Sequence, residues 1–368
     1  MRDVRAALLA GGRGERMGRL TDAICKPMVP YGGGCRLVDF SLANAVRSGV
    51  PELVLMSQHL ERDLIDHLLR WWDRRDQMHV HLGPHEAMID RAGNGHGLLP
   101  DLTLPARPAE HGTADALLTN QEWLFTPGCR DLLVLHADHV YHFDYRPMLR
   151  EHRETGAGVT IGVQHINRRF VRLFGMVEVD QEGWVRSLIE KPAEPTSDLI
   201  FTAFCLFRAD ILRQVLTVLS QLPSGEWQHD ISRDILPFMI REGYRVRAFP
   251  VASYWADIGT VERYLLGHLN LIRSPAALPL SEVPRTLPGA RPTLTAEDGV
   301  VSSDPLTPGA RVRESVLYPG SVIEPGARVE RSVVLPGARV SAGAELCDTI
   351  VLPGEHLTRP RSGLADLA

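Results

Sequence analysis

A repeat near the C-terminus constrains the fold of this chain more than any other feature of its sequence. The segments SVLYPGSVIEPGARVER (315–331), SVVLPGARVSAGAELCD (332–348) and TIVLPGE (349–355) align with a period of 17 residues. Turns of small residues recur at spacings of 11, 6, 11, 6 and 11, at Pro308-Gly309, Pro319-Gly320, Pro325-Gly326, Pro336-Gly337, Ala342-Gly343 and Pro353-Gly354. Short runs of Val, Ile and Leu at near-hexapeptide intervals predict a parallel β-helix, whose coils must stack to bury their apolar faces. A loose Pro/Gly tail would not keep these apolar positions in phase with the turns.

The chain before this repeat alternates strand-like and helix-like runs from residue 5 to about 270. Examples are LVLMSQ before ERDLIDHLLRWW, DLLVLHADHVY before YRPMLREHRETG, and FTAFCLF before RADILRQVLTVLSQL. This alternation indicates an α/β domain with a mostly parallel sheet, whose ligands bind at the carboxyl ends of the strands. A Pro-rich stretch then lacks periodic apolar positions and is interpreted as a linker. We therefore expect one domain over 1–272, a linker over 273–300 and a β-helix domain over 301–360.

Composition narrows the class of protein. The 44% hydrophobic and 23% charged residues are ordinary for a soluble globular protein, and the net charge of −5 gives no reason to expect nucleic acid or an anionic membrane as a partner. The sequence contains no run of 18 apolar residues, so no transmembrane helix is expected, and the N-terminal apolar stretch is too short for a signal peptide. The five cysteines are odd in number and lack CxxC spacing, which favours reduced thiols in a cytoplasm over disulfides or a zinc site.

The N-terminal stretch RAALLAGGRGERMGRLTDAICKP (5–27) has the features of an anion-binding loop. A short apolar run ends in Gly11, Gly12, Arg13 and Gly14, as a buried strand does where it enters a turn. Glycines let the backbone approach an anion closely. The spacing GxGxxxG is also similar to the dinucleotide fingerprint of an NADP oxidoreductase, but three arginines crowd the turn and no acidic residue follows at the ribose position. A P-loop is excluded because no GK[ST] follows. Several cations beside a Gly-rich turn favour a triphosphate.

Three further stretches carry charged residues where strands are expected to end. Asp138 closes the apolar run in LLVLHADHVY, where carboxylates commonly hold magnesium, although it could instead cap the next helix. Lys191 in LIEKP follows an apolar strand and is well placed as a point charge for a phosphate. Asp257 in YWADIGTVERY, taken alone, would be a helix N-cap more often than a ligand. The histidines around Asp138 (His136, His139 and His142) do not form a convincing metal set, and we expect structural roles for them.

Together these stretches resemble the sugar-phosphate nucleotidyltransferases, and specifically the bacterial ADP-glucose pyrophosphorylase family. The matching segments are LAGGRGERM, the LT…KP run, RLVDFSLANAVRSGV, HGTADALLTN, ADHVYHFDY, FGMVEVD, IEKP, HDISRDILP and YWADIGTVERY, which follow one another in family order over nearly the whole chain. The resemblance implies a Rossmann-like nucleotidyltransferase domain followed by a left-handed β-helix. Such β-helix domains mediate subunit contacts, so a homodimer or homotetramer is expected.

The resemblance also assigns roles to residues by position. The loop Gly11, Gly12, Arg13 and Gly14 would clamp the nucleoside triphosphate, with Arg16 on the β- and γ-phosphates and Lys26 near the α-phosphate. Gly112 and Thr113 would lie by the nucleobase and ribose, and Asp138 and Asp257 would hold Mg2+. Gly175, Glu190, Lys191, Phe201 and Thr202 would form the site of the sugar phosphate.

The reaction that the resemblance implies is an in-line attack of a sugar 1-phosphate oxygen on the α-phosphorus, with pyrophosphate leaving. Arg16, Lys26, Asp138 and Lys191 would carry catalysis by positioning and charge neutralisation. No general base is needed, because a phosphate monoester is already ionised at neutral pH.

The chain departs from the family pattern at a few concentrated places. In glucose-using relatives a Ser two places before a Gly, in a segment like SMGIYVF, contacts a glucose hydroxyl, whereas this chain has Phe201 and Ala203 at these places. The aromatic-basic run before GTADA becomes Pro108-Ala109-Glu110-His111. Exchanging hydroxyl-binding contacts for apolar bulk should change which acceptor is taken. Drift in a lightly constrained pocket is the alternative explanation.

Three functions remain open on the sequence alone. The first is a glucose-1-phosphate adenylyltransferase that uses ATP for glycogen synthesis, and the second is a relative that activates a glucose-like cyclitol phosphate, similar to the valienol-1-phosphate guanylyltransferases. The third, a catalytically silent regulatory subunit, is disfavoured because the phosphate cations and metal carboxylates are all present. The altered acceptor positions favour the second function. The choice between ATP and GTP stays open.

Overall fold

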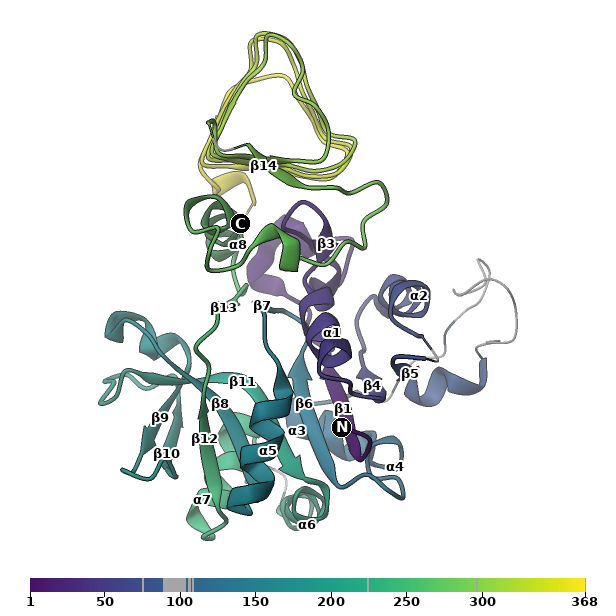
Figure 1. The fold of residues 1–368 in the computed structure, drawn as a ribbon, viewed down its shortest axis with the longest axis vertical. Coiled ribbons are helices and arrows are strands. Elements are labelled where there is room, and N and C mark those ends of the chain that lie inside the picture. The colour runs from purple at the N-terminus through teal and green to yellow at the C-terminus, as the bar shows by residue number, and fades with distance from the viewer. Residues whose placement is uncertain are drawn as a thin grey trace.

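The computed structural model describes the chain except residues 75, 89–103, 105, 106, 108, 224, 296 and 368. An α/β domain forms one end of the molecule, and a prism of stacked coils, triangular when viewed end on, forms the other (Figure 1). None of the helices that the structure describes combines the length and the apolar composition needed to span a bilayer.

A mixed sheet forms the centre of the α/β domain. Its order is β10-β9-β11-β6-β1-β4-β5, and β8 and β12 extend it beside β11. The strands are β1 (Val4–Leu9), β4 (Glu52–Met56), β5 (His79–His81), β6 (Asp131–His136), β8 (Val159–His165), β9 (Gly175–Val179), β10 (Val185–Glu190), β11 (Leu199–Arg208) and β12 (Val246–Pro250). The run β6-β1-β4-β5 is parallel, as is the pair β8–β12, whereas β11 is antiparallel to both β6 and β8. The strand β9 is antiparallel to both β10 and β11, so the expected α/β sheet is present as a mixed sheet with the long antiparallel strand β11 inserted beside β6.

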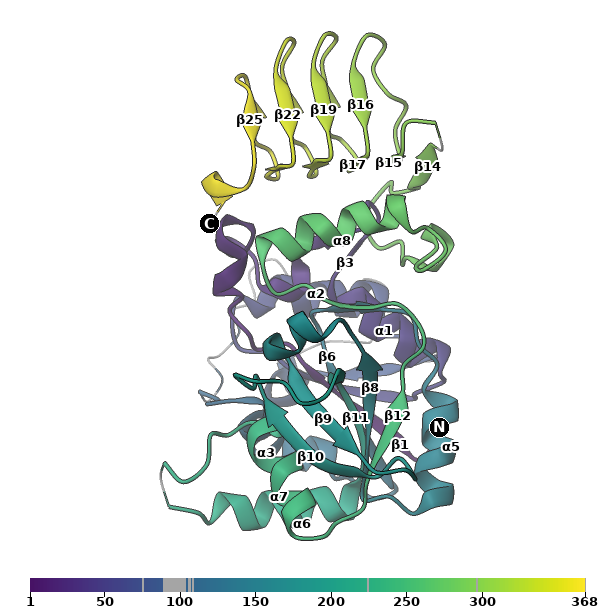
Figure 2. The same cartoon turned by 90° about the vertical axis from the view of Figure 1, so that its left-hand side faces the viewer.

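Helices cover both faces of this sheet (Figure 2). They are α1 (Val38–Arg47), α2 (Glu61–Trp71), α3 (Thr113–Thr119), α4 (Gln121–Leu124), α5 (Tyr145–Thr155), α6 (Ala209–Ser220), α7 (Leu236–Arg241) and α8 (Val261–Arg273). Successive residues of β1 alternate between the two cores, because side chains alternate across a strand. Ala6 and Leu8 pack with α1, α2 and α5, whereas Ala7 and Leu9 pack with α3, α6 and α7. From Ala6 to Leu9 the strand is therefore apolar, and it ends in the polar loop.

The segment 131–141 forms two strands rather than one. After β6 the chain turns, and β7 (His139–Tyr141) pairs antiparallel with β13 (Trp255–Asp257), with His139 opposite Asp257. This pairing brings two segments more than a hundred residues apart to the carboxyl end of β6.

The C-terminal repeat forms the left-handed parallel β-helix that was expected. Its three sheets are β14 (Thr293–Thr295), β15 (Val300–Ser302), β17 (Ser315–Leu317), β20 (Val333–Val334) and β23 (Ile350–Val351); β16 (Arg311–Arg313), β19 (Arg328–Glu330), β22 (Glu345–Cys347) and β25 (Arg361–Ser362); and β18 (Val322–Ile323), β21 (Arg339–Val340) and β24 (His356–Leu357). Val316, Val333 and Ile350 stack in register at the 17-residue period. The glycines of the six small-residue turns all adopt positive φ, between 68° and 84°.

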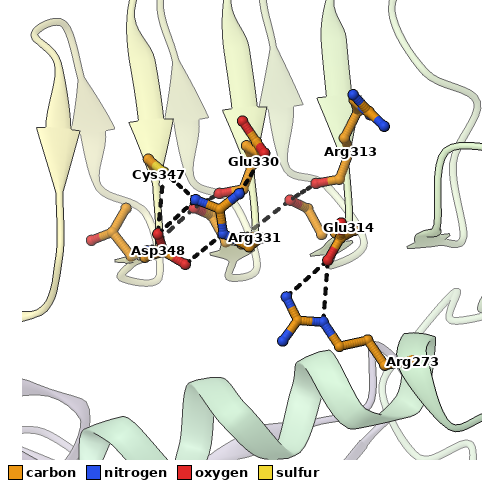
Figure 3. Close-up of polar contacts among 10 residues, drawn as sticks. Arg273, Arg313, Glu314, Glu330, Arg331, Cys347 and Asp348 are labelled. Carbon is orange, nitrogen blue, oxygen red and sulfur yellow. Dashed lines mark hydrogen bonds and ion pairs between the residues drawn. The ribbon is translucent and has the colours of Figure 1, made fainter.

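The third corner of each coil has no glycine. Glu314, Arg331 and Asp348, again 17 residues apart, take it with φ of 42°, 44° and 52°. Arg331 donates two hydrogen bonds to Asp348 in the next coil, at 2.8 Å each (Figure 3). This ladder of polar contacts replaces the conformational freedom that glycine provides at the other corners.

Helix α8 joins the two parts of the molecule. It lies beneath the coils (Figure 2) and shares one apolar core with Val316 and Val333 of the β-helix. Arg273 at its end pairs with Glu314 at 2.8 Å (Figure 3), and His268 contacts the Tyr318 hydroxyl at 2.8 Å. The two parts therefore pack as one body.

The stretch expected to be a linker, 273–300, makes specific contacts. Strand β14 within it pairs with β15 of the β-helix. Thr286 donates a hydrogen bond to Asp39, which is fully buried and also accepts hydrogen bonds from His67, Trp72 and the Arg36 amide. Asp39 is thus a structural anchor that ties the segment 273–300 to the α/β domain.

Candidate active site

Three cavities adjoin at the carboxyl ends of β1, β4 and β6, and Asp138 lines all of them. The first, about 280 Å³, is lined by residues that include Gly11, Gly12, Lys26, Gln58, Glu110, Gly112 and Thr113. The second contains Gly12, Arg13, Gly14, Arg16 and Lys26. The third contains Arg16, Gly175, Glu190, Lys191, Phe201, Ala203 and Asp257. We refer to them as the loop-side, cationic and acceptor-side cavities, respectively.

The Gly-rich loop is folded against Lys26. Gly14 adopts φ 74°, and a Cβ on it would lie 2.9 Å from the Cβ of Lys26, so a glycine is required there. The Thr21 hydroxyl donates to the Gly14 carbonyl at 3.1 Å and closes the turn. Arg13 and Arg16 remain exposed at the mouth of the cationic cavity.

Lys26 connects the two aspartates. It is only 7% exposed, and its Nζ donates to Asp138 Oδ2 at 2.5 Å and lies 4.0 Å from Asp257 Oδ1. Burial alone would raise the pKa of Asp138, but the opposing electrostatics, led by the charge of the hydrogen-bonded Lys26 ammonium, hold that pKa well below its usual range. Asp138 is therefore ionised at neutral pH. Both carboxylates line the acceptor-side cavity, and carboxylate oxygens are ligands that Mg2+ prefers, so these residues suit a divalent metal.

The structure excludes the helix-cap alternatives for both aspartates. The N-cap of α5 is Asp144, whose side chain accepts from the Arg146 amide. The N-cap of α8 is Thr260, whose hydroxyl accepts from the Arg263 amide. The carboxylates of Asp138 and Asp257 thus remain turned to the cavities.

The three histidines of this region separate into two places. His136 and His139 lie with Asp138, and the potential ligand atoms of these three residues are all within 4.8 Å of one another. Burial lowers the pKa of His136 to about 4, so it is neutral at pH 7. His139 stacks on Trp255, with ring centroids 5.2 Å apart, which agrees with a structural role. His142 lies elsewhere, 3.2 Å from Glu282.

Gly112 and Thr113 hold one wall of the loop-side cavity. Helix α3 begins at Thr113 and approaches the carbonyl of His229 so closely that Ala114 donates to it at 2.8 Å. The Thr113 hydroxyl donates to Asp230 Oδ2 at 3.1 Å and accepts from the Ile231 amide at 2.9 Å. Thr113 therefore ties α3 to the segment HDISRD.

Two antiparallel strands and β11 form the acceptor-side cavity. Glu190 ends β10 opposite Gly175 of β9, and its Oε1 lies 3.3 Å from Lys191 Nζ. Lys191 adopts φ 50°, a left-handed conformation that costs a non-glycine residue energy and persists at functional sites. The structure thus brings Gly175, Glu190 and Lys191 together in one cavity, and their role toward the sugar phosphate stays a prediction.

Strand β11 presents alternate residues to this cavity. Phe201 and Ala203 line it, whereas Thr202 points to the other face, is 1% exposed and has its hydroxyl against Gly162. Ala203 adopts φ 60°, a left-handed conformation that favours glycine. It stands at the position where the family pattern of glucose-using relatives has a glycine. The structure therefore brings Phe201 into the site but not Thr202.

Other cavity residues had no predicted role. Gln58 lines the loop-side cavity, and Asp230 and Ser232 line the acceptor-side cavity. Gln58 could have been found from its position at the end of the strand-like run 53–58. Asp230 and Ser232 belong to HDISRD, which matched the family without an assigned role.

These features define a class of enzyme. An α/β sheet whose strand ends carry a Gly-rich loop with free cations, two adjoining carboxylates and a Glu-Lys pair, followed by a β-helix, is the architecture of a nucleotidyltransferase that acts on a phosphorylated sugar. Family comparison agrees: residues 5–274 match the model of the Nucleotidyl transferase family, and residues 289–357 match the GlmU-like C-terminal hexapeptide model. The chain belongs to the nucleotidyl transferase family.

Individual relatives point in the same direction. The chain is 48% identical over 334 residues to a valienol-1-phosphate guanylyltransferase of Streptomyces hygroscopicus subsp. limoneus. The aligned region covers 85% of the chain and 88% of that relative. It is 36% identical over 284 residues to a glucose-1-phosphate adenylyltransferase of Thermomicrobium roseum, covering 76% of the chain and 62% of the relative. A third relative, glucose-1-phosphate adenylyltransferase 1 of Alkalilimnicola ehrlichii, is 31% identical over 352 residues, covering 88% and 79%. The predicted fold and reaction class are confirmed: the protein is a sugar-1-phosphate nucleotidyltransferase.

Proposed function

We propose that the protein joins GTP to a glucose-like cyclitol 1-phosphate of the valienol type and releases pyrophosphate. The observation that carries this proposal is the composition of the acceptor-side cavity. Phe201 and Ala203 line it, while Lys26, Asp138 and Asp257 remain assembled beside it. The residues expected to bind the triphosphate and the metal are kept, whereas the lining of the acceptor-side cavity is changed, as expected of an enzyme that takes a different acceptor. The 48% identity to a valienol-1-phosphate guanylyltransferase also supports the proposal.

On the nucleotide side, positive charge surrounds the expected path of the triphosphate. Arg13 and Arg16 would contact the β- and γ-phosphates from the exposed loop, and Lys26 would contact the α-phosphate from the cavity floor. Nucleotidyltransferases of this kind generally use a divalent metal ion. Mg2+ held by Asp138 and Asp257 would supply charge neutralisation and orientation of the phosphates. Gly11, Gly12, Gly112 and Thr113 would enclose the nucleoside in the loop-side cavity.

On the acceptor side, Glu190 and Lys191 would position the cyclitol phosphate. The Glu190 carboxylate can accept hydrogen bonds from ring hydroxyls, and the Lys191 ammonium can pair with the phosphate. The apolar faces of Phe201 and Ala203 suit a carbocycle that carries fewer polar groups on that side. An oxygen of the phosphate then attacks the α-phosphorus in line, and no proton has to be removed first.

The proposal is tested by measuring pyrophosphate release with MgCl2 for ATP, GTP, UTP and dTTP, each with glucose 1-phosphate and with valienol 1-phosphate. We expect turnover with GTP and the cyclitol, and a kcat/KM for glucose 1-phosphate lower by about 10²-fold or more, because the glucose hydroxyl loses its partner. Robust synthesis of ADP-glucose would overturn the proposal in favour of an adenylyltransferase. No turnover with any pair would favour a silent regulatory subunit.

We also propose that the chain forms a homodimer or homotetramer through the β-helix. Strand β25 ends one β-helix sheet, and an uncovered strand edge at that end would promote irregular association. Light scattering should therefore give two or four times the chain mass, and a monomer at micromolar concentration would contradict this.

All five cysteines are free, as suits a chain in a reducing cytoplasm.

A further inference from the structure

Glu110 lines the loop-side cavity, together with Gln58, Gly112 and Thr113. Its Oε1 accepts a hydrogen bond from Asn120 Nδ2 at 3.2 Å, and its amide donates to Gln58 Oε1 at 3.2 Å. Asn120 is 2% exposed and is itself fixed by a 2.9 Å bond from Nδ2 to the Ala116 carbonyl. The carboxylate is thus held in one orientation by a buried amide.

The other carboxylate oxygen faces the Gly-rich loop. A Cβ placed on Gly11 would lie 3.8 Å from Glu110 Oε2, so the acid reaches across the cavity to the loop. The nearby cation does not neutralise it, because Arg107 directs its Nε to Glu61 Oε2 at 2.9 Å. Within the part of the chain that the structure describes, Glu110 forms no ion pair.

A half-buried carboxylate without a counter-charge costs free energy unless a ligand supplies donors. Burial raises the pKa of Glu110 to about 7, and the neighbouring charges of Asp115 and Glu61 act in the same direction, whereas Asn120 and Arg107 oppose it. Within the chain, Glu110 supplies one acceptor oxygen to Asn120 Nδ2, a role that a neutral amide oxygen could also fill. The arrangement is typical of a residue that serves a ligand.

We propose that Glu110 selects guanine, by accepting hydrogen bonds from the N1–H and the 2-amino group of the base. The inference rests on the proposed function, which assigns the loop-side cavity to the nucleobase. An ionised carboxylate has acceptors only, and guanine presents two adjacent donors on its Watson–Crick edge. Adenine presents one donor beside one acceptor, cytosine presents one donor beside two acceptors, and uracil and thymine present a donor between two acceptors. Guanine alone matches both oxygens.

The same chemistry makes the choice of base dependent on pH. Above a pKa of about 7 the ionised acid suits guanine, whereas below it the protonated acid can donate to N1 of adenine and accept from its 6-amino group. The charged groups around Glu110 are Arg107, Asp115 and Glu61. Between pH 6 and pH 8 the ionised fraction rises about tenfold and the protonated fraction falls about tenfold, so we expect the affinity ratio of GTP to ATP to rise by up to about 100-fold.

The experiment compares equilibrium binding of GTP, ITP and ATP, with MgCl2 and without acceptor, to the wild type, Glu110→Gln and Glu122→Gln. Glu122 is exposed on α4, so this control makes the same charge change outside the cavity. The wild type should bind GTP about 10- to 100-fold more tightly than ATP, with ITP weaker than GTP because it lacks the 2-amino group. In Glu110→Gln this preference and its pH dependence should disappear, since an amide offers one donor and one acceptor and so matches adenine.

Three results would overturn the proposal: a wild type that does not prefer GTP, equal binding of GTP and ITP by the wild type, or an unchanged preference in Glu110→Gln. The first two need no variant, so they hold even if Glu110→Gln does not fold. Because no acceptor is present, a wrong assignment of the cyclitol leaves this test intact. A protein that binds GTP selectively but turns over only glucose 1-phosphate would refute the proposed acceptor and keep the role of Glu110.

Discussion

Asp138→Asn is expected to lower kcat for pyrophosphate release by about 10²- to 10³-fold. Asp138 lines all three cavities, and its Oδ2 receives the Lys26 ammonium at 2.5 Å. The amide keeps the size of the side chain but removes the negative charge that would hold the metal and orient Lys26. Lys26 retains Asp257 as a counter-charge at 4.0 Å, so we expect the variant to fold and to bind GTP.

The matched control is Asp144→Asn, a change of the same kind six residues along the chain. Asp144 caps α5, and asparagine caps helices about as well as aspartate does, so both stability and kcat should stay near the wild-type values. Pyrophosphate release under saturating substrates measures both variants. A kcat for Asp138→Asn within tenfold of the wild type would remove Asp138 from the catalytic machinery.

The predictable parts of the fold are those with a local signature. Apolar runs of the right length became β1, β4, β6 and β8, and the Pro-Gly turns became corners of the β-helix. The antiparallel insertion of β11 beside β6 was not predicted, because strand direction depends on which distant segments pair. The corners at Glu314, Arg331 and Asp348 were also missed, because they use charged residues in place of glycine: Arg331 pairs with Asp348 in the next coil, and Glu314 pairs with Arg273 of α8.

In the candidate site, too, the predictable residues are those with a local signature in the sequence. Asp138 could be placed from its position after an apolar strand, since ligands gather at such ends. The contact of Asp257 with Lys26 depends on the pairing of β7 with β13, which no spacing in the sequence indicates. The assignment of both Phe201 and Thr202 to one site ignored a signal that was present: neighbours in a strand point to opposite faces, so only one of the two can line the cavity.

Gly112→Ala is expected to impair folding and catalysis together. A Cβ on Gly112 would lie 2.3 Å from the His229 carbonyl oxygen and 2.9 Å from its carbon, and backbone atoms cannot move aside as the end of a side chain can. Helix α3 must therefore shift, and with it the 2.8 Å bond from the Ala114 amide to His229 and the contact of Thr113 with Asp230. We expect the free energy of unfolding to fall by about 1–3 kcal/mol. We expect kcat/KM to fall by about 10²-fold, since both the loop-side and acceptor-side walls are displaced.

Gly12→Ala separates the effect of crowding from that of substrate contact. Gly12 lines the loop-side cavity as well, but a Cβ there has nothing within 4 Å, so the chain accommodates it without strain. Thermal unfolding should therefore distinguish the two variants: Gly12→Ala keeps the wild-type Tm, and any loss of activity in it comes from the approach of the nucleotide to the loop. If Gly112→Ala also kept the wild-type Tm, the close contact of α3 with His229 would not be what holds these two cavities in place.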